Sequence, residues 1–230
     1  MRSKLLLAVS GVLFCSTVAG EDTATLGVKQ QFSYGVGFQI AQDLKQRGMD
    51  VDAEFLIQAI RDVFAGAPLK VSTEEMRAAF DTYRQKQMAE HQAVAEKNKK
   101  AGMEFLARNK KEKGITELPS GLQYKVSREG TGKSPLSSDT VTVNYRGTLI
   151  NGEEFDSSYQ RGVPATFPVN GVIKGWQEAL PMMKEGAKWQ IYVPSELAYG
   201  PQGAGGGNIG PNETLIFDIE LISIKDSSPN

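Results

Sequence analysis

The sequence predicts an α+β protein made of two parts with different hydrophobic periods. From Leu26 to about Gly114, apolar residues recur at helical spacing and proline occurs only at Pro68. After Gly114, apolar and polar residues alternate between turn residues, which is typical of strands. We therefore expect a helical region with a long connecting helix, followed by a small, mostly antiparallel α+β domain. The expected boundaries are 21–113 for the helical region, 114–226 for the second domain and 227–230 for a tail.

The first twenty residues have the pattern of a cleaved secretory signal. Arg2 and Lys4 precede an apolar run over residues 5–12, and small residues follow before the first acidic pair. The run is too short for a transmembrane helix, which needs about 20 apolar residues. We expect export, with cleavage near Ala19 or Gly20.

The cysteine and charge content excludes several classes of protein. Cys15 is the only cysteine and lies inside the predicted signal, so a mature chain would have no disulfide. The bulky Phe14 before it argues against lipid attachment. The formal net charge is −1, which favours neither nucleic acid nor an anionic membrane as a partner. The mature protein must rely on core packing or on oligomerisation.

Two helices are expected before residue 70. The first carries apolar residues at four-residue spacing along one face: Phe32, Val36, Ile40 and Leu44. Gly35 and Gly37 weaken this helix but would let another backbone approach closely. Asp52 is the expected N-cap of the second helix, which Gly66 ends.

A third helix of about forty residues is predicted to begin at a capping box formed by Ser72 and Glu75. Polar residues dominate its middle, from 85 to 100. Because an average helix has about 11–12 residues, we interpret this one as an exposed rod. The alternative is a break near Gly102 into two ordinary helices.

The second domain should contain strands and one short helix. Between 141 and 146, apolar residues alternate with polar ones, as in a half-buried strand. Asn151 and Gly152 then predict a tight hairpin turn in which both residues adopt positive φ. The other expected elements are strands over 188–193 and 214–224, a short helical stretch around 176–183, and a glycine-rich loop between the two strands.

Common catalytic motifs are either absent from this sequence or lack the neighbouring secondary structure that they require. Gly205, Gly207 and Gly210 fit a dinucleotide-binding pattern by spacing, but Pro211 and a strand follow where a helix is required. Neither a metal site nor a His-based triad can be built, since His91 is the sole histidine and lies on the polar middle of the long helix. We expect no cofactor and no metal.

A carboxylate pair for acid–base chemistry is the remaining alternative, drawn from Glu153, Glu154 and Asp156. Both glutamates follow a predicted turn, where solvated charge is usual. What remains is an apolar pocket with few hydrogen-bonding groups, which suits a reaction that breaks no bond. Rotation about an X-Pro peptide bond is such a reaction, with a barrier of about 18–20 kcal/mol. A protein lowers this barrier by binding the twisted amide better than the planar forms.

The second domain closely resembles the FKBP-type peptidyl-prolyl cis-trans isomerases over roughly residues 121–224. Five motifs occur in order at compatible spacing: Val143-Asn-Tyr145, Gly152-Glu-Glu-Phe-Asp-Ser-Ser158, Val172-Ile-Lys-Gly-Trp176, Leu197-Ala-Tyr-Gly200 and Leu215-Ile-Phe-Asp-Ile-Glu-Leu221. The resemblance implies a curved antiparallel sheet wrapped around a short helix. It also implies that the substrates are proline-containing unfolded or folding polypeptides.

The resemblance assigns roles to ten residues. Asp156 would sit beside the rotating amide, and Tyr199 would offer its hydroxyl to a substrate carbonyl. Trp176 would form the floor of the pocket and Ile209 its far rim. The walls would be Tyr145, Phe155, Phe167, Val172, Ile173 and Phe217. A core role alone is the alternative for Phe167, Val172 and Phe217.

Two departures from the family pattern concern ligand preference. Ala165 follows Pro164 where the family often has an aromatic residue, so the pocket should be more open on that side. The glycine loop from Gly203 to Gly207 also differs in length from that of small members. Both affect the expected affinity for macrolide inhibitors and the preference for the residue before proline.

The N-terminal half resembles the macrophage infectivity potentiator-like periplasmic subfamily. The matching features are the stretches 33–38 and 48–52 and the long charged helix leading into 118–121. The resemblance implies a periplasmic homodimer joined through the first helices, with outer-membrane association or secretion as alternatives. The apolar face of the first helix supports pairing independently, because only the short second helix could otherwise cover it.

The leading hypothesis is therefore an exported isomerase that accelerates prolyl isomerisation during protein folding. The alternatives are a periplasmic folding chaperone and a proline-peptide binding module with weak or no isomerase activity.

Overall fold

The computed structural model describes residues 26–225, so the predicted signal and the 227–230 tail lie outside the described residues. The chain divides into two compact units, Met1–Ser72 and Thr73–Asn230, here called the N-terminal and C-terminal units. The long helix belongs to the C-terminal unit. Within the described residues, no helix is both long and apolar enough to cross a membrane.

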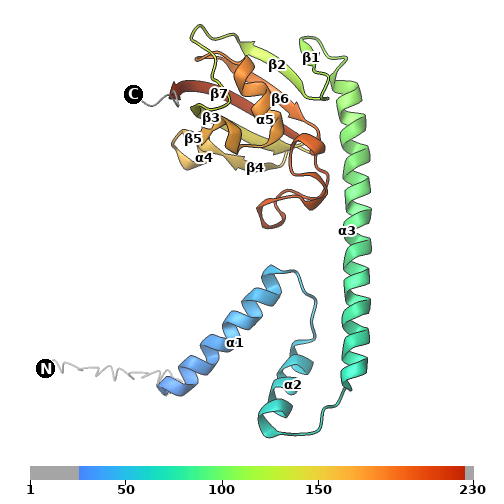
Figure 1. The fold of residues 1–230 in the computed structure, drawn as a ribbon. Coiled ribbons are helices and arrows are strands. Elements are labelled where there is room, and N and C mark those ends of the chain that lie inside the picture. Colours follow the sequence, from blue (N-terminus) through green and yellow to red (C-terminus); the bar gives the residue numbers. More distant parts are fainter. Residues whose placement is uncertain (1–25, 226–230) are drawn as a thin grey trace, which may run out of the picture. The chain divides into compact units, whose positions relative to one another are not determined.

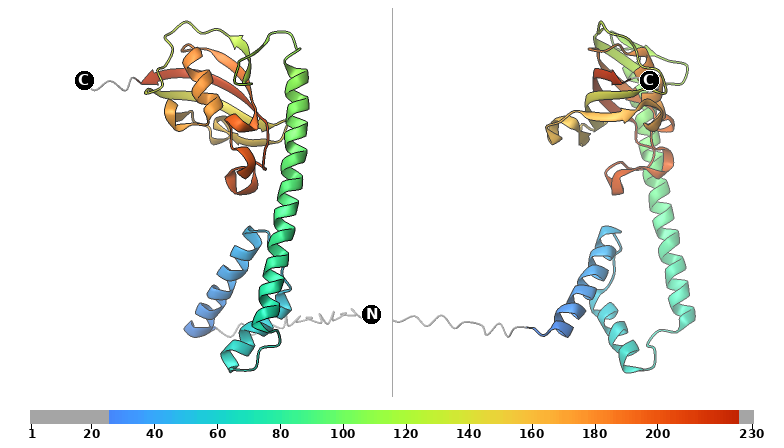
Figure 2. Two further views of the ribbon diagram at one scale, coloured as in Figure 1. Left: turned by 45° about the vertical axis from the view of Figure 1, so that its right-hand side comes forward. Right: turned by 60° about the vertical axis from the view of Figure 1, so that its left-hand side comes forward.

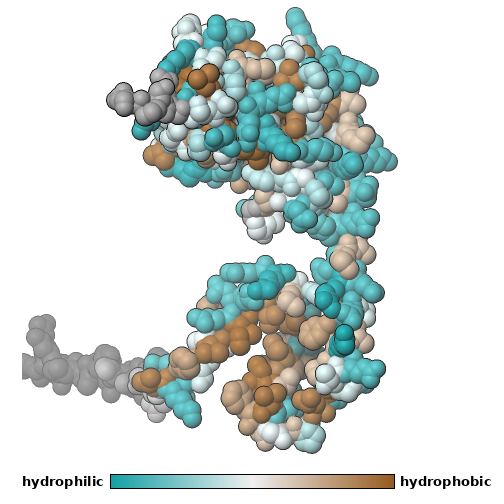
Figure 3. All heavy atoms as spheres, viewed as in Figure 1, coloured by the Kyte–Doolittle hydropathy of each residue, from teal (hydrophilic) through white to brown (hydrophobic). Residues whose placement is uncertain are grey.

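The described part of the N-terminal unit consists of α1 (Val28–Gln46) and α2 (Ala53–Ala65) (Figure 1). The predicted caps of α2 are confirmed: Asp52 Oδ1 accepts a hydrogen bond from Phe55 N at 3.0 Å, and Gly66 ends the helix at φ 62°. Among the described residues of α1 and α2, none is buried. Apolar side chains gather on the surface of both helices (Figure 3).

α3 (Thr73–Asn109) is one continuous helix of 37 residues, so the alternative of a break near Gly102 is wrong. Ala95 and Gly102 are buried, and Phe105 lies 5.9 Å from Tyr192 between ring centroids. A Cβ on residue 102 would lie 2.2 Å from Thr214 Oγ1, so glycine permits a close approach of the helix there. The predicted exposed rod therefore describes only the first part of α3, because the second part packs against the sheet domain (Figures 1 and 2).

Within the described residues, a seven-stranded antiparallel sheet forms the rest of the C-terminal unit. The strand order is β1-β2-β6-β7-β3-β4, and β5 also pairs with β3. The strands are β1 (Ile115–Glu117), β2 (Gln123–Arg128), β3 (Thr140–Leu149), β4 (Glu154–Ser157), β5 (Ala165–Pro168), β6 (Lys188–Val193) and β7 (Leu215–Lys225). The helices are α4 (Ser158–Arg161) and α5 (Lys174–Ala179). Short 3₁₀ turns occupy Val169–Gly171, Leu180–Met182, Ser195–Leu197, Gly200–Gln202 and Gly205–Gly207.

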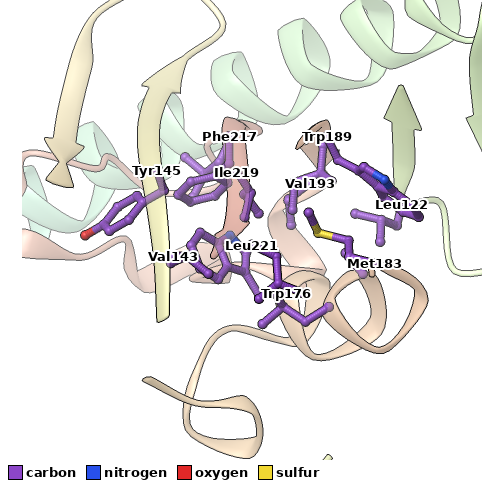
Figure 4. Close-up of a cluster of buried hydrophobic side chains, with 14 of the residues drawn as sticks. Leu122, Val143, Tyr145, Trp176, Met183, Trp189, Val193, Phe217, Ile219 and Leu221 are labelled. Atoms are coloured by element: carbon purple, nitrogen blue, oxygen red, sulfur yellow. The ribbon is translucent and has the colours of Figure 1, made fainter. Parts of the chain in front are cut away.

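Alternation along the strands separates an inner face from an outer face. Val141, Val143 and Tyr145 point inward, as the sequence predicts, together with the buried residues of β7, which are Leu215, Phe217, Ile219 and Leu221. Trp176 and Ala179 of α5 complete this core (Figure 4). The outer face of β2 and β6 carries Gln123 and Tyr192, which contact α3. The sheet thus lies between α5 on the inner face and the second part of α3 on the outer face.

The hairpin between β3 and β4 differs from the prediction. Gly152 has a φ of 89°, but Asn151 is not among the described non-glycine residues with positive φ. Leu149 N donates to Glu153 O at 2.8 Å, and Gly152 N donates to Leu149 O at 3.0 Å. The turn therefore uses a longer loop with one left-handed glycine rather than two residues with positive φ.

Candidate functional site

A cavity of about 130 Å³ opens on the inner side of the sheet. Nine residues line it: Tyr145, Phe155, Asp156, Phe167, Val172, Ile173, Trp176, Tyr199 and Phe217. All nine are among the ten residues that the family resemblance assigns to the site. The cavity is smaller than the roughly 300–1,000 Å³ typical of pockets for drug-sized ligands. Its size therefore suits one small apolar ring.

The topology of β3 explains how residues from separate strands meet here. β4 and β5 both pair with β3, β5 along its first part and β4 along its last part. Asp156 lies opposite Gly147, and Phe167 lies opposite Val141. A Cβ on residue 147 would lie 2.6 Å from the Phe155 ring and 2.9 Å from the Phe217 ring. Gly147 thus leaves room for two aromatic walls.

The aromatic rings around the cavity meet edge to face. Trp176 is 3% exposed, and its ring centroid lies 5.4 Å from Tyr145, 6.0 Å from Phe167 and 5.3 Å from Phe217. The interplanar angles are 87°, 88° and 85°. Edge-to-face packing of this kind fixes ring orientation as well as burying apolar area. The walls are therefore apolar, and Figure 4 labels three of their aromatic residues, Tyr145, Trp176 and Phe217.

One side of the cavity carries a fixed carboxylate. Asp156 accepts hydrogen bonds from the Tyr145 hydroxyl and from Arg161 Nη1. Arg161 Nη2 also donates to the Tyr145 hydroxyl at 2.8 Å, and its guanidinium lies 5.4 Å from the Tyr145 ring centroid. Burial acts to raise the pKa of Asp156, but the two hydrogen bonds and the arginine charge together lower that pKa below its usual value. Asp156 is therefore ionised and held in one orientation at neutral pH.

Tyr199 contributes a second polar group to the cavity. Its side chain is 41% exposed. Burial raises the pKa of the Tyr199 hydroxyl, and the negative charge of Asp156 raises it further. The hydroxyl consequently stays protonated at neutral pH, as a hydrogen-bond donor to a ligand carbonyl must be.

Sequence reasoning missed Arg161 and Ser158. Arg161 reaches back to Asp156 because the short helix α4 places it one turn away, and Gly162 ends that turn at φ 71°. Ser158 is fully buried, and its Oγ accepts a hydrogen bond from Tyr145 N at 2.9 Å. The only available signal was the proximity of both residues to Asp156 in sequence. A helix of four residues cannot be predicted from pattern alone, because one turn has no stability of its own.

Two residues singled out in the sequence lie away from the cavity. Ile209 is 6% exposed, belongs to the core cluster and does not line the cavity. Ala165, in β5, pairs with Val143 of β3 and packs against the core.

The described residues contain no cluster of His, Cys, Asp and Glu side chains that could hold a metal ion.

Comparison with known proteins connects both parts of the chain to one family. Residues 132–222 match the FKBP-type peptidyl-prolyl cis-trans isomerase domain, and residues 29–126 match the domain amino-terminal to it. The chain is 44% identical to the outer membrane protein MIP of Legionella longbeachae over 234 residues, which cover 99% of this chain and all of that one. It is 42% identical to the peptidyl-prolyl cis-trans isomerase Mip of Coxiella burnetii, with 98% of this chain and 99% of the relative covered.

A solved structure agrees with these matches. The crystal structure of FkpA from Escherichia coli superposes with a TM-score of 0.63 at 37% sequence identity, covering 88% of this chain and 99% of that one. Both the helical region and the sheet domain are thus shared with known isomerases. The chain belongs to the FKBP-type peptidyl-prolyl cis-trans isomerase family.

Proposed function

We propose that the cavity performs the isomerisation by binding an X-Pro bond in its twisted form, and that the clients are exported proteins as they fold. The observation that carries this proposal is the small apolar cavity with Trp176 at its floor and two polar groups, Asp156 and Tyr199, among its lining residues. Its volume of about 130 Å³ suits a proline ring.

The chemistry needs no proton transfer and no covalent intermediate. Amide resonance makes the planar X-Pro bond polar and gives a rotational barrier of about 18–20 kcal/mol. An apolar cavity takes water away from the planar amide, which loses more solvation than the twisted one. The cavity therefore binds the twisted state more tightly than either planar state, and this difference in binding lowers the barrier.

The two polar residues have separate proposed roles. The Tyr199 hydroxyl donates a hydrogen bond to a substrate carbonyl and so fixes the backbone next to the proline. Asp156, held by Tyr145 and Arg161, places a carboxylate beside the rotating amide. A fixed negative charge there is preorganised, so no reorganisation is needed when the amide twists.

The test is cis-to-trans relaxation of a short X-Pro peptide with the mature protein and with the variants Asp156→Ala and Tyr199→Phe. We expect acceleration by the wild type and a loss of about tenfold or more in each variant, because each loses a preorganised charge or hydrogen-bond donor at the amide. Tyr159→Phe is the matched control, because Tyr159 is 50% exposed and does not line the cavity. Unchanged rates in both site variants would refute the assigned roles.

Two chains are proposed to pair through the apolar faces of α1 and α2. The support is the exposure of large apolar side chains there, with Phe32 at 72% and Phe38 at 58%. A cavity of about 510 Å³, lined by α1 and α2, is apolar over most of its wall and includes Phe38, Ile40 and Ile57. An exposed apolar surface of this extent is typical of a protein–protein contact.

Export to the periplasm is proposed from the predicted signal over the first twenty residues. A relative carries the name outer membrane protein, which supports an envelope location for this chain. Mass spectrometry of the exported protein is the test, and an intact N-terminus would refute export by cleavage.

A chaperone function that does not depend on isomerisation is the second candidate. The apolar surface of α1 and α2 favours it, because such a surface can also hold unfolded chains. Suppression of aggregation that survives in Asp156→Ala, while isomerisation is lost, would establish it.

A further inference from the structure

The segment that follows Tyr199 is a loop closed at its base. Asn212 N donates to Gly200 O at 2.8 Å, so the end of the loop is tied to the residue next to Tyr199. A bridge between Ala204 and Ile209 closes the loop a second time. Six glycines lie in this stretch, at positions 200, 203, 205, 206, 207 and 210. So many glycines give a backbone little conformational preference of its own. Contacts from elsewhere must therefore define its position.

α3 supplies these contacts from one face. His91 Nε2 lies 2.9 Å from Pro201 O, and Asn98 Nδ2 donates to Pro211 O at 2.9 Å. In the opposite direction, Asn212 Nδ2 donates to Ala95 O at 3.3 Å. Positions 91, 95 and 98 are spaced by four and three residues, so they share one face of the helix. The loop lies beside α3 in Figures 1 and 2.

Asn212 joins the helix to the neighbour of Tyr199 through a single residue. Its φ is 55°, which makes it the one non-glycine residue with positive φ within 26–225. Asparagine tolerates this left-handed conformation better than most residues. In this conformation the backbone N–H bonds Gly200 while the side chain bonds Ala95. The conformation is therefore coupled to the contact with α3.

The helix itself is held firmly enough to serve as a support. Farther along the same face, Gly102 lies against Thr214, the residue before β7. At the end of the helix, Asn109 Nδ2 donates to Gln123 Oε1 at 2.9 Å, and Gln123 Nε2 donates to Leu106 O at 3.0 Å. Gln123 is fully buried. The second part of α3 is thus fixed to the sheet independently of the loop.

We propose that α3 is a positioning element of the isomerase site, in which Asn98 and Asn212 hold the loop so that Tyr199 presents its hydroxyl to the cavity. The inference rests on the proposed role of Tyr199. It gives the long helix a part in catalysis in addition to connecting two parts of the chain. A catalytic group must be held by supporting contacts to act efficiently, and here the support comes from more than a hundred residues earlier in the chain.

The experiment uses the full mature chain and three asparagine variants. Asn98→Ala removes the donor to Pro211. Asn212→Gly keeps a residue that accepts positive φ but removes the amide that bonds Ala95. Asn109→Ala is the matched control, because it also removes a hydrogen bond between α3 and the sheet domain but lies away from the loop. The readouts are kcat/KM for a short X-Pro peptide and the thermal unfolding midpoint.

We expect Asn98→Ala and Asn212→Gly each to lower kcat/KM by about fivefold, the rate equivalent of one lost hydrogen bond. Asn109→Ala should leave kcat/KM within about twofold of wild type. Its unfolding midpoint should nevertheless fall about as much as the midpoints of Asn98→Ala and Asn212→Gly, because each variant loses one hydrogen bond. Equal losses of kcat/KM in all three variants would refute the proposal, because they would report general loosening of the helix.

A double-mutant cycle tests whether the effect passes through Tyr199. If it does, Asn98→Ala should lower kcat/KM much less in the Tyr199→Phe background than in the wild type. Additive losses would refute the proposed route. Full activity of Tyr199→Phe alone would overturn the role of Tyr199 itself. An impaired Tyr199→Phe with unimpaired Asn98→Ala and Asn212→Gly would overturn only the positioning by α3.

Discussion

The apolar side chains of the two units have opposite surroundings. In α1 and α2, large apolar residues lie at the surface, with Phe64 89% exposed. In the sheet domain, Trp176 is 3% exposed and meets three aromatic rings. Both regions carry apolar faces in sequence, but among residues 26–225 only the second buries its apolar face. A hydrophobic pattern therefore predicts an apolar face without saying what covers it.

Removal of Trp176 should have the largest effect on stability. Trp176→Ala deletes a buried aromatic side chain and leaves a cavity, which typically costs about 3–5 kcal/mol in the free energy of unfolding. Phe64→Ala, studied where the chain is monomeric, should cost less than about 0.5 kcal/mol because Phe64 is exposed. Urea unfolding monitored by circular dichroism, which reports both units, measures both. Similar losses would show that the contrast between the two units is false.

Truncation of Phe38 should act on assembly rather than on folding. Phe38 is 58% exposed and lines the apolar cavity of α1 and α2. Burying such a side chain contributes about 1.5–3 kcal/mol, and a homodimer would bury two copies, so Phe38→Ala should raise the dimer dissociation constant by about 100-fold or more. Light scattering over a concentration series measures it, with Phe80→Ala in α3 as the control, since Phe80 is 63% exposed. A monomer mass for the wild type at micromolar concentration would contradict the proposed homodimer.

Two helix glycines provide a further comparison. A Cβ at Gly102 would lie 2.2 Å from Thr214 Oγ1, whereas a Cβ at Gly35 would meet no atom within 4 Å. Gly102→Ala should therefore destabilise the C-terminal unit by about 1–3 kcal/mol through overpacking. Gly35→Ala should stabilise α1 by about 0.5–1 kcal/mol in the monomer.

Thermal unfolding and circular dichroism of both variants distinguish the two glycines. If Gly102→Ala is as stable as the wild type, α3 does not approach the sheet as closely as inferred. If Gly35→Ala instead weakens the dimer, a second backbone lies against that glycine in the assembly.

The sequence allowed the local elements and most of the cavity to be predicted. The N-cap at Asp52, the C-cap at Gly66 and the alternation of β3 follow from short-range chemistry, and all are confirmed. The nine cavity residues came from family motifs. Periodicity alone cannot bring Asp156 and Trp176 to one cavity, because their meeting depends on how β4 pairs with β3 and where α5 packs.

The docking of α3 could not be predicted, for a physical reason. The face that meets the sheet domain carries His91, Ala95, Asn98 and Gly102 and, farther along, Phe105, and these residues form no apolar stripe. Its contacts are hydrogen bonds to backbone carbonyls, a close approach at glycine and one ring contact, and these leave no hydrophobic period. For the same reason, the sequence pattern of α3 predicted an exposed rod. Ile209 does not line the cavity, and a residue in a glycine-rich loop gives no sequence signal of the direction it faces.

The smallest expected effect is a pH dependence at Asp156. The folded protein lowers the pKa of this carboxyl, because hydrogen bonds from Tyr145 and Arg161 outweigh the opposing effect of burial. A lowered pKa means that the ionised carboxylate stabilises the fold at pH values above the unfolded pKa of about 3.9. This stability is lost as pH falls through the lower pKa of the folded state.

The side chains of Arg161 and Asp156 are 45% and 43% exposed, so solvent screening limits the contribution to less than about 1 kcal/mol. The free energy of unfolding of wild type should therefore exceed that of Asp156→Asn at pH 7, and the difference should shrink as pH falls below about 3.9. A difference that stays constant over this range would mean that Asp156 acts through its shape alone, and that Arg161 does not hold an ionised carboxylate beside the cavity.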